Sequence, residues 1–537
     1  MALWCVFCAS PTWQQAGFAK PVLYCHDNGA KGPARRPVLK SHVISRQESA
    51  TVGNISHLEP TAIWANFQKL CDIPRPSTKE EAVLQMIEKL ADDHGCSHYR
   101  DSGSNLVVNV PATAGYEDRK ITVLQSHVDM VTQANSGSTH NFDTDPISAY
   151  VDGEWVTADN TTLGADNGIG AAAMLGVMCD KSVEHGPLEL LFTVDEERGL
   201  TGAMNLEPGR LQGEILLNLD TEDEYELYVG CAGGGDLVAR WQYQADAVSG
   251  DMAARKIALT GLKGGHSGID IILGLGNANK LMARFLRPLL RDLDARIVTI
   301  QAGTARNAIP RESFATIVLP AANIAAFDGA LTAFRDAIIG EYADLEPNFA
   351  IAASETDMPA TAMGPADSIT FNNAILGAPN GVQAMSTSVP GVVETSINLA
   401  IVSVADGLAK VTLSARSSIS SARDATRDVA TAVFENIGAT VAWGDAYPGW
   451  KPNMDSEVLE MMQAVHRDLF GRDAEVKVIH AGLECGVLGS KYPNWDMISF
   501  GPTIKRAHSP DECAHIPAVA RFWDYLQAAL KAIPKAA

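Results

Sequence analysis

Four short apolar segments, each followed by acidic or histidine side chains, constrain the fold of this chain more than any other feature. They are residues 121–124, 188–194, 214–219 and 495–500, and segments with helical periodicity separate them. Short apolar runs of this kind are typical of parallel strands that are buried on both faces. The sequence therefore predicts an α/β fold, with a mostly parallel sheet and helices on both of its faces.

The middle of the chain has a different pattern. Residues 234–445 contain alternating strand-like segments, such as 257–259 and 409–413, together with helical segments such as 278–290 and 424–437. This mixture is typical of an α+β domain. We expect a split α/β domain formed by residues 53–233 and 446–537, with the α+β domain of residues 234–445 inserted into it.

Two helix starts are predicted near the beginning of the first domain. Pro60 and Thr61 open an amphipathic helix, and Ser77 with Glu80 has the spacing of a capping box for a second. Residues 1–52 differ from the rest, being rich in Pro, Gly and basic residues. We expect a disordered N-terminal extension there; a targeting segment and an over-extended start are the alternatives.

Composition excludes several classes of function. The 537 residues are 46% hydrophobic and 20% charged, which is typical of a globular protein and not of a disordered one. With 42 basic against 64 acidic residues, the net charge of -22 repels nucleic acids and anionic membranes. The nine cysteines are scattered and odd in number, which favours a reducing compartment. We expect a cytoplasmic protein with neither nucleic acid nor a membrane as partner.

Side chains able to bind metals follow the predicted strands. The carboxyl ends of parallel strands lie at one edge of the sheet, so these side chains should converge there. Clustered carboxylates repel one another unless cations neutralise them. Imidazole and carboxylate ligands suit zinc, with manganese or cobalt as alternatives. The sequence predicts a site for two divalent ions with five ligands, His127, Asp166, Glu197, Asp220 and His508.

Taken singly, these residues have simpler explanations. His127 fits a hydrogen-bonded core histidine, and Asp220 fits a helix cap or a surface acid. The pair Glu196 and Glu197 fits a solvated surface. Their joint placement after the predicted strands favours the metal site.

Seven segments together carry a resemblance to a known family. They are residues 125–131, 163–170, 195–202, 218–222, 264–268, 480–486 and 501–510. Over residues 54–537 the chain resembles the dinuclear metallopeptidases of the M20 family. The segment Ala481–Gly486 favours its branch of non-specific dipeptidases, which includes aminoacyl-histidine dipeptidases.

The resemblance implies a role for each metal-site residue. It implies that His127 and Asp220 hold one ion, that Glu197 and His508 hold the other, and that Asp166 bridges them, with a cis peptide bond after Asp166. Asp129 would orient the ring of His127. Glu196 would be the general base.

The resemblance also implies that the inserted domain is a lid that completes the site. His266 would donate a hydrogen bond to the transition state, and in some relatives it comes from the partner subunit; a loop histidine bonded to the backbone is the alternative. Asn307 would contact the substrate. Arg416 would bind a free carboxylate, unless it is an ordinary surface arginine. Gly482 and Glu484 would border the substrate, although Glu484 is equally consistent with a structural role.

The resemblance therefore implies a two-metal dipeptidase of broad specificity, including Xaa-His dipeptides, that forms a homodimer. One alternative is another M20-type amidohydrolase, such as a tripeptidase or an N-acyl-amino-acid hydrolase. A second is a non-catalytic binding protein on a peptidase fold, which would be expected to lack the base or a ligand. All five ligands and Glu196 are present in the sequence.

Overall fold

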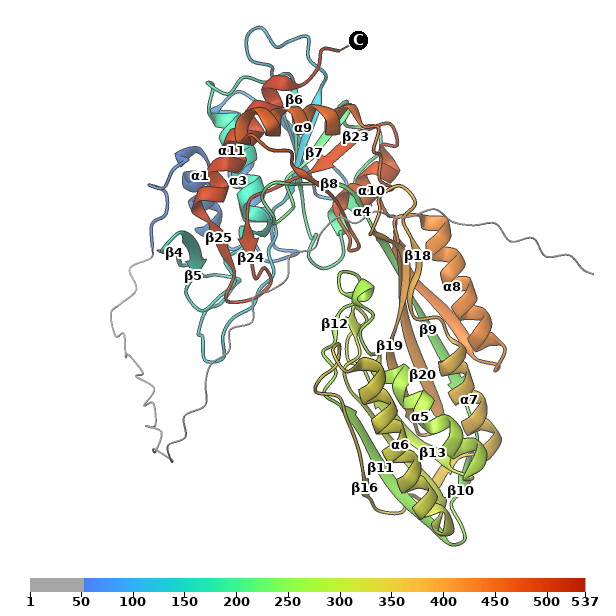
Figure 1. The fold of residues 1–537 in the computed structure, drawn as a ribbon. Helices are drawn as coiled ribbons and strands as arrows, with labels where there is room; N and C mark the ends of the chain where they lie inside the picture. The colour runs from blue at the N-terminus through green and yellow to red at the C-terminus, as the bar shows by residue number, and fades with distance from the viewer. Residues whose placement is uncertain (1–52, 537) are drawn as a thin grey trace, which may run out of the picture. The chain divides into compact units, whose positions relative to one another are not determined.

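Two large β-sheets dominate the computed structural model, which describes residues 53–536 (Figure 1). The expected N-terminal extension of residues 1–52 lies outside the described residues. Among residues 53–536, no helix combines the length and the apolarity needed to cross a membrane.

The first sheet has eight strands in the order β1-β2-β6-β3-β7-β23-β8-β22. Its centre, β6-β3-β7-β23, is parallel, as is the pair β8-β22, whereas β1 and β2 pair antiparallel at one edge. All four predicted apolar segments form neighbouring strands of this parallel centre. The strands are β1 (Ser97–Arg100), β2 (Leu106–Val110), β3 (Thr122–His127), β6 (Leu188–Thr193), β7 (Ile215–Asn218), β8 (Glu226–Cys231), β22 (Glu475–Ile479) and β23 (Asp496–Ser499).

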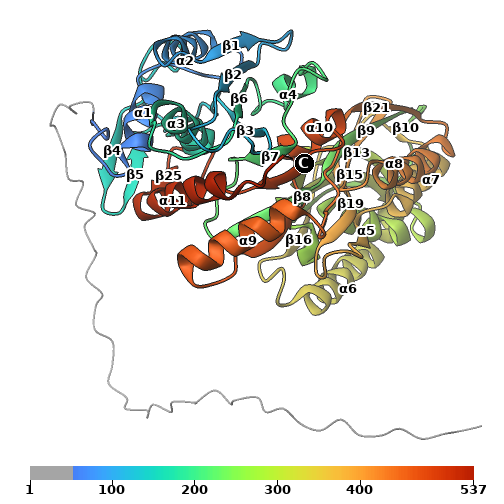
Figure 2. The ribbon, with the colours of Figure 1, turned by 90° about the horizontal axis from the view of Figure 1, so that it is seen from above.

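Helices cover both faces of this sheet, as predicted. Alternate residues of one strand enter different cores: Leu190 of β6 packs in the larger core, and its neighbour Leu191 packs in the smaller one. The smaller core lies under α4 (Thr201–Asn205) and α10 (Glu484–Lys491). The larger core includes residues of α1 (Thr61–Cys71), α2 (Glu81–Asp93), α3 (Ala165–Cys179), α9 (Glu457–Phe470) and α11 (Ile516–Ala532), and α1 and α3 lie side by side in both views (Figure 1, Figure 2).

The second sheet is antiparallel, and its main strand order is β16-β11-β15-β13-β19-β20-β9-β21. One further strand, β18 (Gly381–Met385), pairs with β19 outside this order. Four helices cover one of its faces (Figure 1): α5 (Ala278–Asp292), α6 (Ile324–Tyr342), α7 (Pro365–Gly377) and α8 (Ser420–Glu435). The strands are β9 (Gly233–Gln242), β11 (Met252–Thr260), β13 (Arg296–Ala302), β15 (Ser313–Pro320), β16 (Ala350–Glu355), β19 (Val393–Ala405), β20 (Leu408–Ser417) and β21 (Thr440–Tyr447). This is the α+β arrangement that the alternating segments predict.

The chain enters and leaves the second sheet through adjacent strands. It passes from β8 directly into β9, and it returns to the first sheet after β21, which pairs with β9. We therefore propose the division into domains at residues 233/234 and 445/446 that the sequence suggests. This connection allows β22 and β23, late in the sequence, to join strands formed by residues before the insertion.

Small sheets carry two loops near the carboxyl ends of the parallel strands. A four-stranded sheet, β24 (Ile504–Lys505), β25 (Cys513–His515), β5 (Trp155–Ala158) and β4 (Ala149–Asp152), holds the loop that contains His508. The pair β12 (Gly265–His266) and β14 (Ala308–Ile309) places His266 opposite Ala308. A third small sheet consists of the pair β10 (Ala245–Ala247) and β17 (Thr361–Met363).

The predicted helix start at Ser77 is wrong. Helix α2 begins at Glu81, and Thr78 has a φ of 71°, a left-handed conformation that interrupts helical geometry. The Ser77 hydroxyl donates to the Asp129 carboxylate instead of capping a helix. Glu80 accepts from the backbone N–H groups of Thr78 and Asp195. The capping box is therefore replaced by long-range bonds to Asp129 and Asp195 and by a local bond between Thr78 and Glu80. The predicted helix at Thr61 is confirmed by α1.

Candidate metal centre and active site

The parallel strands bring the predicted ligands to one edge of the first sheet. His127 ends β3, and Asp220 follows β7, which is the neighbour of β3. Glu196 and Glu197 lie in the turn after β6, on the other side of β3. Asp166 lies in the first turn of α3, and the peptide bond between Asp166 and Asn167 is cis, as the family resemblance implied.

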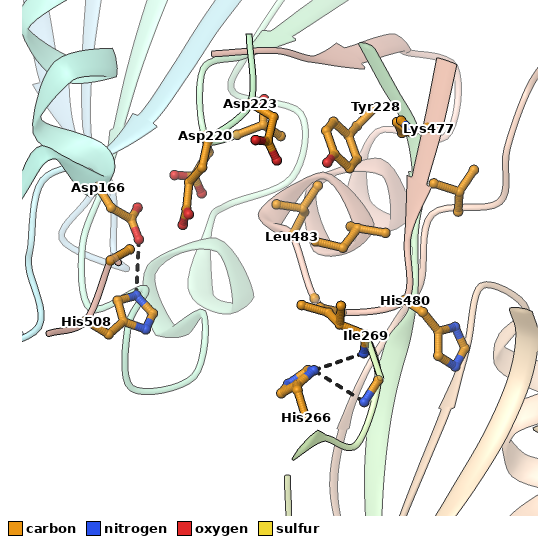
Figure 3. Close-up of a pocket in the computed structure, with 18 of the residues that line it drawn as sticks. Asp166, Asp220, Asp223, Tyr228, His266, Ile269, Lys477, His480, Leu483 and His508 are labelled. Atoms are coloured by element: carbon orange, nitrogen blue, oxygen red, sulfur yellow. Dashed lines mark hydrogen bonds and ion pairs between the residues drawn. The ribbon is translucent and has the colours of Figure 1, made fainter. Parts of the chain in front are cut away.

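Asp166 lies between the two histidines. Its Oδ2 is 3.1 Å from His508 Nε2 (Figure 3). Its Oδ1 is 3.2 Å from His127 Nε2. Each imidazole faces a second carboxylate, since His127 Nε2 is 3.4 Å from Asp220 Oδ1 and His508 Nε2 is 3.0 Å from Glu197 Oε2. Two pairs of predicted ligands, His127 with Asp220 and His508 with Glu197, therefore share the carboxylate of Asp166.

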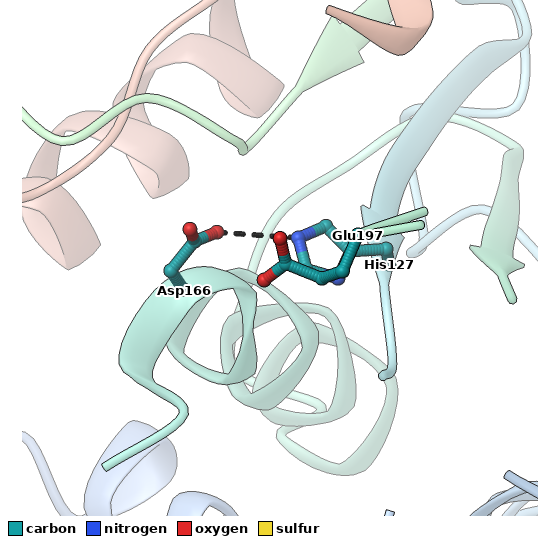
Figure 4. A group of neighbouring side chains, drawn as sticks. All are labelled: His127, Asp166 and Glu197. Atoms are coloured by element: carbon teal, nitrogen blue, oxygen red, sulfur yellow. Dashed lines mark hydrogen bonds and ion pairs between the residues drawn. The ribbon is translucent and has the colours of Figure 1, made fainter. Parts of the chain in front are cut away.

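The residues present fit a pair of divalent ions. Donor atoms of His127, Asp166 and Glu197 all lie within 4.8 Å of one another (Figure 4). Glu197 Oε1 is buried and has no hydrogen-bond partner among the described residues, which leaves a lone pair available to a cation. Imidazole nitrogens and carboxylate oxygens are ligands suited to zinc, manganese or cobalt.

The charges of this cluster are strongly coupled. Burial alone would lower the pKa of His127, but the carboxylates of Asp220, Asp129 and Asp166 raise it well above its usual value. Hydrogen bonds to Asp166 and Glu197 raise the pKa of His508 to about 11. Burial raises the pKa of Asp220 to about 6. The cluster therefore needs positive charge, which protonated histidines or metal ions can provide.

Asp129 lies behind His127 and is fully buried. Its Oδ1 is 3.3 Å from His127 Nδ1, on the opposite side of the ring from the other ligands. The same carboxylate accepts from the backbone N–H groups of Glu196 and Glu197. Asp129 thus contacts both the imidazole and the loop that carries Glu197, the arrangement expected of a residue that orients a ligating histidine.

Glu196 lines the cavity beside the ligands without being one of the paired groups. Burial raises the pKa of its carboxyl well above the usual value, and the neighbouring Asp220, Glu484 and Glu197 raise it further, against His127. A carboxylate that binds a proton more readily than in water is suited to general base catalysis.

A cavity of about 810 Å³ joins the ligands to residues of the inserted segment. One wall carries His127, Asp166, Glu197, Asp220 and His508, together with Glu196. His266, Ile269 and His480 lie apart from Asp166 and His508 in Figure 3, and Gly268 and Gly482 also line the cavity. The volume lies within the usual range for small-molecule sites.

His266 is held in one protonation state and one tautomer. Burial lowers the pKa of the imidazole to about 4, and the neighbouring Arg416 lowers it further. Its Nδ1 accepts from the backbone N–H groups of Gly268 and Ile269, at 3.3 and 3.1 Å (Figure 3). The proton of the neutral ring therefore lies on Nε2, so that the ring can donate a hydrogen bond. His266 is therefore bonded to the backbone, as the alternative expected, and it also lines the cavity; its hydrogen bond to the transition state stays a prediction.

Arg416 is buried, with only 7% of its surface exposed, so it is not a surface arginine. Its Nε donates to Ser267 Oγ and its Nη1 to Tyr447 Oη, and no carboxylate among the described residues pairs with it. Gly268 lies directly against its Cδ, and Gly482 lies against the ring of Tyr447. Both glycines line the cavity, whereas Arg416 and Tyr447 do not.

Four predicted residues do not line this cavity: Asp129, Asn307, Arg416 and Glu484. Asn307 is exposed and lines a separate cavity, which it shares with His266. Glu484 is fully buried; its Oε2 accepts from Gln125 and Thr193, and burial raises its pKa to about 8. Of the two roles considered for Glu484, this arrangement favours the structural one, whereas Gly482 does border the cavity.

The structure adds residues that sequence reasoning missed. Arg75 and Glu512 are buried beside the loop of Asp166, and Glu222 and Tyr228 line the cavity. Glu512 lies four residues after His508, just beyond the last family segment, so a slightly longer segment would have included it. No local pattern marks Arg75, because its partners are backbone carbonyl groups distant in sequence.

Residues 123–532 match the family model described as Peptidase family M20/M25/M40. The chain is 42% identical over 483 residues to the cytosol non-specific dipeptidase of Escherichia coli (strain K12), which covers 90% of this chain and 100% of that protein.

Solved structures of a dipeptidase and of a tripeptidase are also similar to this chain. The aminoacylhistidine dipeptidase of Vibrio alginolyticus superposes with a TM-score of 0.84 at 45% identity, covering 90% of this chain and 99% of that chain. A tripeptidase of Staphylococcus aureus subsp. aureus mu50 has a TM-score of 0.50 at 16% identity, with 89% and 99% covered, which is a likeness of fold alone.

Proposed function

Because the chain belongs to peptidase family M20/M25/M40, we propose that it is a metal-dependent dipeptidase of broad specificity, whose substrates include Xaa-His dipeptides. The relatives of 42% and 45% identity, which are named as dipeptidases and match nearly their whole length, support this assignment. We propose zinc as the metal, with manganese or cobalt as alternatives.

Arg416 is the observation that carries the dipeptidase assignment. A buried guanidinium without a carboxylate partner is costly, because its charge is desolvated and not compensated. Arginine binds carboxylates through two parallel hydrogen bonds, so the free carboxylate of a short peptide would provide the missing partner. A site that binds this terminus close to the scissile bond favours dipeptides over longer chains.

Each ligand has a proposed place in the metal centre. His127 and Asp220 would hold one ion, Glu197 and His508 the other, and Asp166 would bridge them. When bound, two divalent ions would polarise the scissile carbonyl group and lower the pKa of a water molecule.

The remaining steps belong to side chains of this chain. Glu196 would accept a proton from the attacking water and deliver it to the nitrogen of the leaving amine. His266, with its proton on Nε2, would donate a hydrogen bond to the oxygen on which negative charge develops. Arg416 would hold the carboxylate, and Asn307 would contact the substrate after the lid closes.

We also propose a cytoplasmic location and a homodimer. The described cysteines form no disulfide, which agrees with a reducing compartment. The molecular mass measured by analytical ultracentrifugation would be twice the 57.2 kDa of the single chain if the protein is a dimer. Sedimentation at the mass of a single chain over a wide concentration range would contradict the dimer.

A substrate panel tests the proposed function. Chelator-treated protein would receive Zn²⁺, Mn²⁺ or Co²⁺ and then be assayed on Gly-Leu, Xaa-His dipeptides, tripeptides and N-acyl amino acids. We expect metal-dependent hydrolysis of the dipeptides alone. Cleavage of tripeptides or N-acyl amino acids at comparable rates would instead favour one of the other M20-type activities. Absence of hydrolysis with any metal would favour a binding protein.

A further inference from the structure

One buried carboxylate binds most of the backbone that leads into Asp166. Glu512 Oε2 accepts from the N–H groups of Leu163 and Gly164 at 2.8 and 3.0 Å. Its Oε1 accepts from those of Ala165 and Asp166 at 2.7 and 3.3 Å. Glu512 is only 2% exposed. Four consecutive backbone donors thus converge on a single side chain, and the last of them belongs to the shared ligand.

A buried guanidinium holds the same loop from the other side. Arg75 is 1% exposed, and its Nη2 donates to the carbonyl oxygen of Gly164. A Cβ at Gly164 or Gly168 would lie 2.5 or 2.7 Å from Arg75 Nη2, so only glycine leaves space for this group. The peptide groups flanking Gly164 therefore lie between a buried positive and a buried negative charge.

These two residues connect the segments that carry three ligands. Arg75 Nη1 also donates to the carbonyl oxygens of Val128 and Asp129, which directly follow His127. Glu512 lies four residues after His508 in the same loop region. The backbone at His127, at Asp166 and beyond His508 is thus joined through Arg75 and Glu512, neither of which lines the cavity.

We propose that Glu512 and Arg75 are positioning residues that set the metal affinity of the centre by fixing the backbone that carries Asp166. The proposal rests on the proposed function, in which Asp166 is shared by both ions. A displacement of this one backbone segment would change the ligand geometry at both ions. Groups that orient metal ligands typically contribute 10- to 100-fold to metal affinity.

The chain offers a matched control for a general loss of stability. Glu189 is also buried, at 5% exposed, and its carboxylate accepts from the backbone N–H groups of Gln212 and Gly213. It lies near the start of β6, at the opposite end of that strand from the ligands. Glu189→Gln therefore removes the same kind of interaction away from the metal centre.

The test compares Glu512→Gln with Glu189→Gln in the full chain. The glutamine amide nitrogen cannot accept a hydrogen bond, so Glu512→Gln loses about half of the acceptor capacity and sets a donor against backbone N–H groups. Metal-free proteins would be titrated with Zn²⁺ in competition with a chromophoric chelator, and their urea unfolding measured. We expect about 10- to 100-fold weaker binding of both ions in Glu512→Gln and unchanged affinity in Glu189→Gln.

Arg75→Lys is a second, independent variant. Its ammonium group keeps the charge but lacks the planar fork that reaches Gly164 and Val128 together, so we expect the same direction of change. If Glu512→Gln fails to fold, Arg75→Lys carries the test. Affinities equal to those of the unmodified protein would overturn the proposal, as would equal losses in Glu512→Gln and Glu189→Gln. If the unmodified protein itself binds no divalent ion, the proposed function fails instead.

Discussion

Adjacent residues in the turn after β6 have different proposed roles. Glu196 lies beside the paired ligands, whereas Glu197 contacts His508 directly. Glu196→Gln should lower kcat by about 10²- to 10⁴-fold, the usual contribution of a general base, because the amide cannot accept a proton. Metal content measured by elemental analysis should stay at two ions per chain.

Glu197→Gln is the matched control for that variant. It removes a proposed ligand, so it should lower the metal content as well as the activity. If Glu196→Gln retained full activity, or lost its metals as Glu197→Gln should, the separation of roles would be wrong.

Arg416 gives a prediction about substrate recognition. Arg416→Ala should lower kcat/KM for dipeptides with a free carboxylate by roughly 10- to 150-fold, the effect of losing about 1.5–3 kcal/mol from a charge-assisted hydrogen bond. Dipeptide amides should be poor substrates of the unmodified enzyme and should show little further change in the variant. The measurement is a comparison of kcat/KM for matched acids and amides.

Arg423 provides the control for Arg416. It is also buried, but it pairs with Asp424 and donates to the backbone of Tyr447. Arg423→Lys should leave the ratio between acids and amides unchanged. Equal hydrolysis of acids and amides by the unmodified enzyme would contradict a carboxylate-binding role for Arg416.

His480 connects pH with stability. Burial lowers its pKa to about 3, and the neighbouring Arg416 lowers it further. The unfolded chain binds a proton at His480 near pH 6.5, whereas the folded chain binds it only near pH 3. The contribution of His480 to the free energy of unfolding is therefore fully present above pH 6.5 and is lost as the pH falls toward 3. In His480→Asn this part of the pH dependence, on the order of 3 kcal/mol, should be absent. Urea unfolding of both metal-free proteins between pH 4 and 7 provides the measurement; identical pH profiles would contradict the assignment.

At the scale of secondary-structure elements, α5 stabilises the end of α7. Lys280 of α5 donates from Nζ to the carbonyl oxygens of Ile375, Leu376 and Ala378, where α7 ends. These carbonyl groups have no helical partners, and a cation is favourable at that end of a helix. Lys280→Met should destabilise this region by about 1–3 kcal/mol and speed hydrogen exchange in residues 365–377.

A second contact between the same helices provides the control. Arg287 donates to Asn373 on the exposed surface, so Arg287→Met should change the free energy of unfolding by less than about 0.5 kcal/mol. Neither residue lines the cavity, so kcat/KM should stay within about twofold in both variants. Equal effects of the two substitutions on hydrogen exchange would contradict the capping role of Lys280.

At the scale of the whole molecule, the cavity is bordered by residues from both large sheets. In the proposed mechanism, the metal ligands, His266 and Arg416 act on one small substrate. We therefore expect the lid to close when a dipeptide binds, excluding water from the site. With both metals present, Glu196→Gln should show a smaller radius of gyration in X-ray scattering when a dipeptide is added. No change should occur with the dipeptide amide, and an unchanged radius with a bound dipeptide would contradict closure.

Local sequence patterns were sufficient for the α/β core and for the choice of most candidate ligands. Burial on both faces imposes apolar runs on β3, β6, β7 and β23, and parallel strands place the residues that follow them at one edge. His127, Glu197 and Asp220 could therefore be selected before their contacts were known. The family resemblance added the cis peptide bond after Asp166, and the structure contains that bond.

The tertiary structure determined the contacts between residues that are distant in sequence. Ser77 and Glu80 have the spacing of a helix cap, yet their bonds go to Asp129 and Asp195, because Thr78 interrupts the helix. Glu512 and Arg75 bind backbone groups, which every residue has, so no sequence pattern identifies their partners. The sequence by itself determined which strands form the sheet and which side chains follow them, since both depend on local periodicity. Only the tertiary structure determined what holds those side chains in place, because that depends on which distant backbone groups become buried together.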